Sequence, residues 1–301
     1  MKRTNSRQPP RPPRGKTRGD APQKPEFRRG SSKGAGIRPS AHTPRARGEG
    51  GTERPAPYPR SWRQVAGTHA IVELLKIHPK SVEVVLLQNN WKTSADLRDL
   101  AEQLDQKKIK IEEKSETQLH EICRSHQGAV AFSSQALDFD YEGMKWQDRG
   151  IVIALDGVED AQNLGAILRT SWLMGVNGMI IPEDRAVGLT ATVHKVACGG
   201  VEHVPLHRTN QFQQPFEVLK KAGFWVFGLS HKAKKTVYDI QLPEKVVWVL
   251  GAEDKGLRVP TEKACDELVS IPQLSAEASY NVSVSAALAL GETKRQWALK
   301  K

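Results

Sequence analysis

Apolar residues recur with two different spacings between residues 61 and 136 of this 301-residue chain. Short apolar runs at 82–87, 109–111 and 128–132 predict strands. Between and before them, apolar residues recur every three or four positions, as at Leu97, Leu100 and Leu104, which predicts amphipathic helices. Residues 61–136 are therefore expected to form a small α/β domain, followed by a polar linker at 137–150.

From residue 151 onward the apolar runs become longer and continuous. Helix-length segments separate most of these runs, which lie at 151–155, 178–181, 224–229, 246–250 and 268–271. Strands that are buried on both faces of a mainly parallel sheet have this pattern. A last helix is expected over 284–299, so residues 151–301 are predicted to form a second, larger α/β domain.

The first 60 residues have a different composition. They contain 16 Lys and Arg against 4 Asp and Glu, and 11 of the 18 prolines, whereas residues 61–301 hold 29 basic and 30 acidic residues. So few large apolar side chains cannot bury enough surface to offset the entropy of ordering, which predicts a disordered basic tail. An organelle transit peptide is the alternative, but the density of Pro and Gly disfavours its amphipathic helix.

Several classes of protein are excluded by what the sequence lacks. No run approaches the roughly 18 apolar residues of a membrane-spanning helix, and the N-terminus has no apolar centre of a secretory signal. Cys123, Cys198 and Cys265 are scattered, as expected in a reducing compartment. We therefore expect a cytoplasmic protein without membrane contact. His194 and the other histidines are not spaced as metal ligands, and core or surface packing explains them better.

Ligands of open α/β sheets gather at the carboxyl ends of the strands, so the loops after the predicted strands are the candidate sites. After the first strand of the larger domain, Asn163 is placed to cap a helix, and Gly165 would allow a close approach. Arg169 lies four residues after Gly165, on the same helix face, where its guanidinium could meet a phosphate. The alternative is that Asn163 only caps and that Arg169 is solvated or ion-paired.

Two further loops carry polar residues at strand ends. Gly251 and Gly256 bracket Glu253 directly after the run 246–250, and the segment 271–283 is rich in hydroxyl and amide side chains. Within that segment, Ser279 or Asn281 is placed to cap the last helix. The signatures of dinucleotide-binding, phosphate-loop, serine-hydrolase and zinc-protease sites are absent.

Taken together, segments 163–169, 251–256 and 271–284 closely resemble the three motifs of the SpoU/TrmH branch of the SPOUT RNA methyltransferases, in the same order. The resemblance covers residues 151–297. Residues 67–75 and 126–128 are similar to the L30e-like substrate-binding domain that precedes the catalytic domain in the branch that methylates a guanosine ribose in 23S ribosomal RNA.

The resemblance implies a catalytic domain with a deep trefoil knot, a homodimer formed through that domain, and S-adenosylmethionine bound among the three loops. Gly251, Ile271 and Tyr280 match the family's cofactor contacts, with Asn281 nearby. The family usually has leucine where this chain has Tyr280, so a larger ring is expected beside the adenine site. No metal is required.

The resemblance also implies that Asn163, Arg169 and Glu253 form the catalytic set. A free guanidinium holds its proton at pH 7, which favours an orienting and phosphate-binding role for Arg169 over that of a base.

The expected activity is 2′-O-ribose methylation of RNA, with ribosomal RNA favoured over transfer RNA. A non-catalytic RNA-binding or ribosome-assembly protein is the alternative from another class, and the intact catalytic set argues against it. The basic tail would add affinity without reading sequence, or would act only as a spacer.

Overall fold

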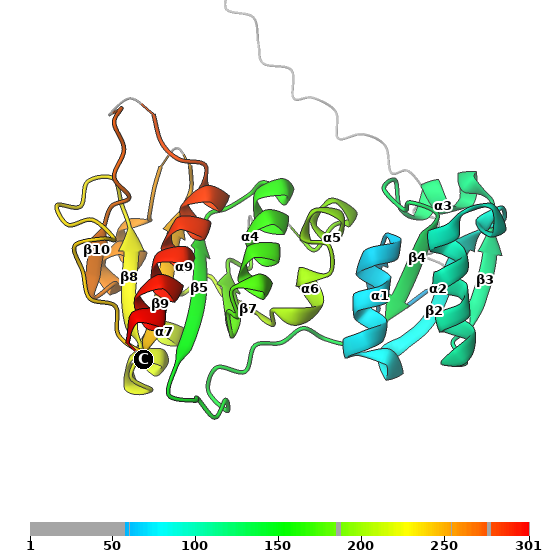
Figure 1. The fold of residues 1–301 in the computed structure, drawn as a ribbon, viewed down its shortest axis with the longest axis horizontal. Helices are drawn as coiled ribbons and strands as arrows, with labels where there is room; N and C mark the ends of the chain where they lie inside the picture. The colour runs from blue at the N-terminus through cyan, green and yellow to red at the C-terminus, as the bar shows by residue number, and fades with distance from the viewer. Residues whose placement is uncertain (1–57, 60, 185–187, 254, 276–277, 301) are drawn as a thin grey trace, which may run out of the picture. The chain divides into compact units, whose positions relative to one another are not determined.

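Two β-sheets organise the chain, each with its own helices (Figure 1). The structure is a computed structural model that describes residues 58–59, 61–184, 188–253, 255–275 and 278–300. The basic tail predicted at residues 1–60 lies almost entirely outside the described residues. The described residues all belong to one compact unit.

The smaller sheet has four strands in the order β1-β4-β2-β3. β4 is antiparallel to both β1 and β2, and β2 is parallel to β3. Side chains from α1 and α2 cover one face of this sheet, and side chains from α3 cover the other. The elements are β1 (Arg63–Ala66), α1 (Thr68–Ile77), β2 (Val82–Gln88), α2 (Ala95–Gln106), β3 (Ile111–Lys114), α3 (Glu116–Ile122) and β4 (Ala129–Ser133), with single 3₁₀ turns at Pro79–Ser81 and Trp91–Thr93.

The larger sheet has six strands in the order β10-β8-β9-β5-β6-β7, and every neighbouring pair is parallel. Its strands are β5 (Gly150–Asp156), β6 (Gly178–Ile181), β7 (Leu206–Arg208), β8 (Trp225–Leu229), β9 (Lys245–Gly251) and β10 (Glu267–Val269). Its helices are α4 (Ala161–Leu173), α5 (Ala191–Ala197), α6 (Gly200–His203), α7 (Gln213–Lys221), α8 (Val259–Ala264) and α9 (Val282–Leu299).

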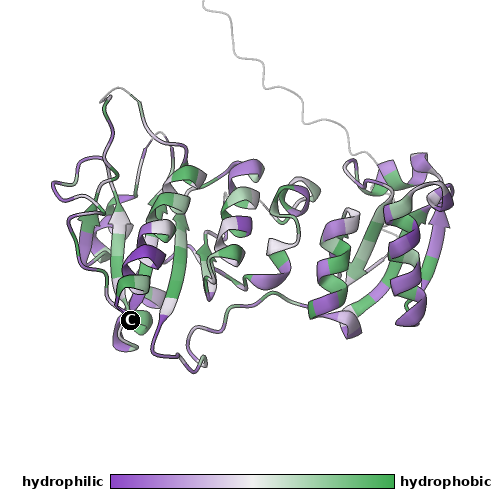
Figure 2. Ribbon diagram, in the orientation of Figure 1, coloured by the Kyte–Doolittle hydropathy of each residue, from purple (hydrophilic) through white to green (hydrophobic). Residues whose placement is uncertain are grey.

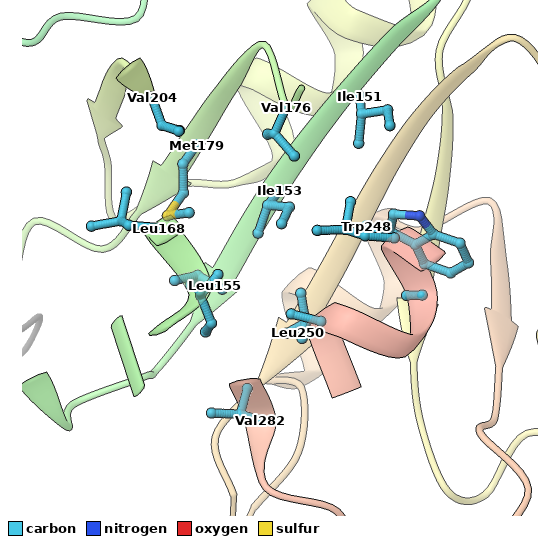
Figure 3. Packing of buried hydrophobic residues seen from close by; sticks show 14 of the residues in the cluster. Ile151, Ile153, Leu155, Leu168, Val176, Met179, Val204, Trp248, Leu250 and Val282 are labelled. Carbon is cyan, nitrogen blue, oxygen red and sulfur yellow. The ribbon is translucent and has the colours of Figure 1, made fainter. Parts of the chain in front are cut away.

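Residues of β5 alternate between two buried faces of the larger sheet, as the pleat of a strand requires. Ile151, Ile153 and Leu155 point into a core that they share with α4 and α9 (Figure 3). Val152 and Ala154 point to the opposite face, into a second core with side chains of α7. Because both faces are covered, the central strand β5 is hydrophobic over most of its length, as Figure 2 shows.

Helix α9 is fixed to β9 by the largest fully buried side chain of the described residues. Trp248 is fully buried, and its indole nitrogen donates a hydrogen bond to Thr293 Oγ1 at 2.9 Å. The Thr293 hydroxyl in turn donates to the carbonyl of Ala289 at 2.8 Å. The only polar atom of the indole is therefore satisfied inside the core, and α9 is held in one position on the sheet.

The predicted strands and the last helix are confirmed, with ends that differ by at most three residues. Two strands were missed, β1 and β7, because each contains polar residues and neither forms a continuous apolar run. The prediction that Asn163 caps its helix is wrong. Helix α4 begins earlier, because the Asp160 carboxylate accepts a hydrogen bond from the amide of Gln162 and caps the first turn. Of the two residues predicted to cap the last helix, Ser279 and Asn281, Asn281 is the one that caps α9.

Strand order reverses between β5 and β9. The chain adds β6 and β7 on one side of β5, then crosses to build β8, β9 and β10 on the other side. Such a switch point leaves a crevice at the carboxyl ends of the two central strands, where ligands bind in open α/β sheets. Among the described residues, no helix combines the length and the apolar character needed to cross a membrane.

His194 lies buried in α5 with no polar partner among the described residues. The residue is 1% exposed, and neither ring nitrogen makes a hydrogen bond. Burial, helped by the positive charge of Arg63, lowers the pKa of His194 to about 3. The imidazole is therefore neutral in the folded protein, and of the two expected alternatives, core or surface packing, His194 takes the core.

His194→Leu should make the free energy of unfolding less dependent on pH below neutrality. The folded-state pKa lies below the unfolded value of about 6.5, so the stabilising contribution of neutral His194 is complete above that pH. It is lost as the pH falls from about 6.5 toward 3, because the unfolded chain binds the proton first. Between pH 7.5 and 5.5, urea unfolding should show that the variant loses about 1 kcal/mol less than the parent.

The matched control is His69→Leu, at an exposed position of α1, which should keep the pH dependence of the parent. If the two leucine variants respond to acid identically, His194 does not stay neutral in the fold.

Candidate functional site

Three chain segments meet at the carboxyl ends of β5 and β9. The two strands pair in register over their whole length, so Asp156 at the end of β5 lies opposite Gly251 at the end of β9. The segment that follows β5 leads into α4, the segment that follows β9 turns back on itself, and the segment before α9 arrives beside them (Figure 1). Polar residues far apart in sequence are thereby placed within one crevice.

A hydrogen bond between two asparagines joins the first and third segments. The Asn281 amide nitrogen donates to Asn163 Oδ1 at 2.9 Å. The Asn281 side-chain oxygen accepts hydrogen bonds from the amide and the hydroxyl of Ser283, at 2.8 and 2.6 Å. Asn281 therefore caps α9 and holds the first turn of α4 at the same time. The two roles explain why an amide, with both donor and acceptor, suits this position.

The second segment is a tight turn whose geometry requires glycine at its start. Ala252 and Gly256 exchange two backbone hydrogen bonds, of 3.1 and 2.8 Å. A Cβ atom on Gly251 would overlap the backbone of Gly256 and Leu257, which cannot move aside without opening the turn. Gly256 has a φ of 65°, in the left-handed region.

Asp156 fixes the far end of this turn and was not singled out as a site residue from the sequence. Its carboxylate is buried, and Oδ2 accepts a hydrogen bond from the backbone amide of Arg258 at 2.8 Å. The other oxygen lies 3.2 Å from Arg258 Nε, close enough for an ion pair but not aligned as a hydrogen bond. The signal in the sequence was a carboxylate that directly follows a strand buried on both faces.

Two adjoining cavities open among the three segments. The first, of about 320 Å³, is lined by Gly251, Ile271 and Tyr280, three of the four residues expected to contact a cofactor. The second, of about 350 Å³, is lined by Asn163 and Asp156. The lining residues common to both cavities are Ala252, Glu253, Lys255, Gly256 and Val282. The turn after β9 therefore forms the wall between the cavities.

The side chain of Tyr280 connects the two ends of the third segment. Its hydroxyl donates a hydrogen bond to the carbonyl of Pro272 at 3.3 Å, and the residue is 41% exposed. The hydrogen bond ties the two ends of the 272–280 segment together and presents the aromatic ring to the first cavity.

Arg169 does not line either cavity. It is exposed on α4, and its Nη1 donates to Cys198 Sγ at 3.4 Å, in the turn between α5 and α6. Gly165 faces the same direction, since a Cβ there would lie 2.7 Å from the Cβ of Val196 in α5. The shared face predicted for Gly165 and Arg169 is therefore observed. The element that packs closely against Gly165 is therefore helix α5.

The other site residues are brought together, since Asn163, Gly251, Glu253, Ile271, Tyr280 and Asn281 all surround the two cavities or bond across them. Over the described part of the chain, no three His, Cys, Asp or Glu side chains gather in a way that could hold a metal ion.

Each of the two α/β parts of the structure matches a known protein family. Residues 150–291 match the SpoU rRNA methylase family. Residues 64–136 match the family described as RNA 2′-O ribose methyltransferase substrate binding.

Curated relatives align over most of their own length. The 23S rRNA (guanosine-2′-O-)-methyltransferase RlmB of Nitrosomonas europaea is 39% identical over 239 residues, covering 77% of this chain and 91% of the relative. The protein of the same name from Neisseria meningitidis is 36% identical over 243 residues, covering 79% of this chain and 97% of the relative.

Solved structures share the fold at lower sequence identity. The SpoU methyltransferase AviRb from Streptomyces viridochromogenes, solved in complex with the cofactor AdoMet, has a TM-score of 0.68 at 20% identity and covers 79% of this chain and 91% of its own. The AdoMet-bound rRNA methyltransferase from Sinorhizobium meliloti has a TM-score of 0.66 at 21% identity and covers 78% of this chain and 87% of its own. From these matches and the identities above 30%, the chain belongs to the SpoU rRNA methylase family, with a substrate-binding α/β domain preceding the catalytic domain.

Proposed function

We propose that this chain transfers the methyl group of S-adenosylmethionine to the ribose 2′-hydroxyl of a guanosine in 23S ribosomal RNA. The observation that carries the proposal is the meeting of the three motif segments, joined by the Asn163–Asn281 hydrogen bond, around two adjoining cavities. Curated relatives at 36–39% identity carry this activity in their names and align over more than nine-tenths of their length. One cavity then serves the methyl donor and the other the nucleoside.

The first cavity suits the methyl donor. Its lining combines the aromatic ring of Tyr280 and the apolar side chain of Ile271 with the tight backbone at Gly251. Hydroxyl and charged side chains, among them Ser285 and Glu262, complete the lining, so the cavity offers both apolar contacts and hydrogen-bonding groups to a ligand. The bound cofactor supplies an electrophilic methyl group on a sulfonium. Gly251, Ile271, Tyr280 and Asn281 are the residues that would hold it.

The second cavity adjoins the first and suits the acceptor nucleoside. The ribose oxygen forms a bond to the methyl carbon as the carbon–sulfur bond breaks, S-adenosylhomocysteine leaves, and the hydroxyl proton passes to water. Holding the two reactants in line at near-attack distance can remove about 7 to 11 kcal/mol of barrier. Asn163 and Glu253, which line this cavity, keep the segments in register for that alignment.

Arg169 orients the RNA. Its guanidinium is exposed and is held by the turn between α5 and α6, so it can bind a phosphate next to the target ribose. A guanidinium with a pKa above about 12 remains charged at pH 7 and is a poor base. Positive charge beside the ribose also stabilises the negative charge that develops on the oxygen as its proton leaves.

The domain organisation supports the same function. We assign residues 61–136 to an L30e-like substrate-binding domain, 137–150 to a linker and 151–301 to a trefoil-knotted catalytic domain that forms a homodimer. The first 60 residues carry a large positive excess, which would neutralise RNA phosphates and add affinity without sequence preference. The choice of target then depends on the substrate-binding domain and on the shape of the RNA.

Methyl transfer to defined RNAs tests the proposed function. We expect calorimetry to detect binding of S-adenosylmethionine, and tritiated methyl groups to enter an unmodified 23S transcript as 2′-O-methylguanosine. 16S and transfer RNA should remain unlabelled under the same conditions. Label in transfer RNA would favour the alternative substrate, and absence of cofactor binding would favour a non-catalytic RNA-binding protein.

Gly251→Ala should weaken cofactor binding at least about tenfold, or about 1.4 kcal/mol, because the added methyl group must push the turn after β9 open. Calorimetry with S-adenosylmethionine measures the change. Gly188→Ala is the control, since an added Cβ there meets nothing within 4 Å and its φ is not in the left-handed region. Equal affinity of the two variants would remove the turn from the cofactor site.

Arg169→Ala should lower the single-turnover rate of methyl transfer by about 100-fold or more, because the ribose loses its orienting charge. Binding of S-adenosylmethionine should be unchanged, since Arg169 lies outside both cavities. Arg169→Lys should recover only part of the rate, because an ammonium keeps the charge but cannot bind a phosphate with two parallel hydrogen bonds. A full rate in the alanine variant would show that Arg169 has no part in the reaction.

A further inference from the structure

Helix α6 begins in direct backbone contact with α4 at Arg169. A Cβ on Gly200 would lie 2.9 Å from the carbonyl oxygen of Leu168 and 3.0 Å from both N and Cα of Arg169. Backbone atoms of a helix cannot move aside, so only glycine allows this approach. Two residues earlier, Cys198 has a φ of 49° and accepts the hydrogen bond from Arg169. The start of α6 therefore sets the position of Arg169.

The other end of α6 binds the substrate-binding domain through a buried ion pair. Arg63, in β1, donates from Nη1 and Nη2 to the two carboxylate oxygens of Glu202, at 2.7 and 2.6 Å. The Glu202 side chain is fully buried and that of Arg63 is 13% exposed. Such a two-bond pair fixes both the distance and the orientation of its partners. Once one partner is lost, the remaining buried charge is costly, which makes the contact specific.

His203, the residue after Glu202, makes a second connection to the substrate-binding domain. Its Nε2 lies 2.9 Å from Glu73 Oε2, in α1 of the substrate-binding domain. Burial raises the pKa of Glu73, but Lys76 and His203 outweigh burial and hold it below the ordinary value, so the carboxylate stays charged. The His203 ring also stacks on Trp172, with ring centroids 4.2 Å apart and planes 11° apart. Trp172 lies three residues after Arg169 on α4, so this contact also ends at the same helix.

We propose that α6 couples the substrate-binding domain to Arg169, with Glu202 as a positioning residue for methyl transfer. The inference rests on the proposed function. The helix has four residues and spans about 6 Å, so it has no room to absorb a displacement between its two ends. RNA held by the substrate-binding domain therefore reaches Arg169 at a fixed distance. Neither Glu202 nor Arg63 touches the reacting atoms in this arrangement.

This role predicts a specific pattern of kinetic change. A displacement of about 1 Å in the placement of a reactant can cost about 100-fold in rate. Losing the Arg63–Glu202 pair should therefore lower kcat, while the cofactor cavity and the RNA-binding surface of each domain remain intact. An ion pair that only stabilises the fold would behave differently, because it would lower the midpoint of unfolding and leave kcat per folded molecule unchanged.

The test uses the full-length chain with Glu202→Gln and, from the other partner, Arg63→Lys. We expect kcat for methylation of the 23S transcript to fall by about 10- to 100-fold in Glu202→Gln and less in Arg63→Lys, which keeps the charge. Affinities for S-adenosylmethionine and for the transcript should change by less than about threefold, a pattern that indicates loss of transition-state positioning. Rates are expressed per cofactor-binding site, so any unfolded fraction is excluded.

Asp266→Asn is the matched control. It removes an ion pair with Lys220 elsewhere in the catalytic domain and keeps an oxygen that can accept from the Val226 amide. Its kcat should equal that of the parent. Parental kcat in both Glu202→Gln and Arg63→Lys would overturn the coupling role, and so would a loss confined to RNA affinity. Failure of the parent itself to methylate any RNA would instead overturn the proposed function.

Discussion

The in-register pairing of β5 with β9 is the constraint on which the site depends. Seven consecutive residue pairs align the two strands, so both end at the same level, at Asp156 and Gly251. A shift of one residue would turn every side chain of a strand to the opposite face, and both faces are buried. The hydrophobic cores therefore fix the register, and the register places the two loops beside each other at the switch point of the sheet.

Short polar contacts then hold the loops that the sheet has brought together. The hydrogen bond between Asn163 and Asn281 joins two helix starts, and the buried Asp156 carboxylate holds the backbone at Arg258. Each contact satisfies groups that would otherwise be orphaned at a strand or helix end. These contacts thus fix the loops whose residues line both cavities, which suits a reaction whose barrier falls mainly through positioning.

Contacts at α6 join the smaller α/β domain to the catalytic domain. Gly200 lies against the backbone of Arg169, and Glu202 receives Arg63 from the smaller sheet. The neutral, buried His194 lies near the same arginine, and its pKa is lowered by burial and by that charge. A substrate-binding domain attached only by a polar linker would leave the ribose free to move. In the coupling that we propose, the contacts at α6 remove that freedom.

The sequence by itself determined the α/β class, the strands of 151–301 and the three motif segments, and it placed Asn281 where it could cap the last helix. These features depend on hydrophobic periodicity and local turn chemistry, which neighbouring residues specify. It missed β1 and β7, which contain polar residues and form no continuous apolar run, and misplaced the cap of α4, which is Asp160 and not Asn163. Only the tertiary structure decided that Arg169 faces Cys198 and α6, outside both cavities, and that Arg63 pairs with Glu202 across 139 residues. Such partners are chosen by the packing of distant elements, which no local spacing records.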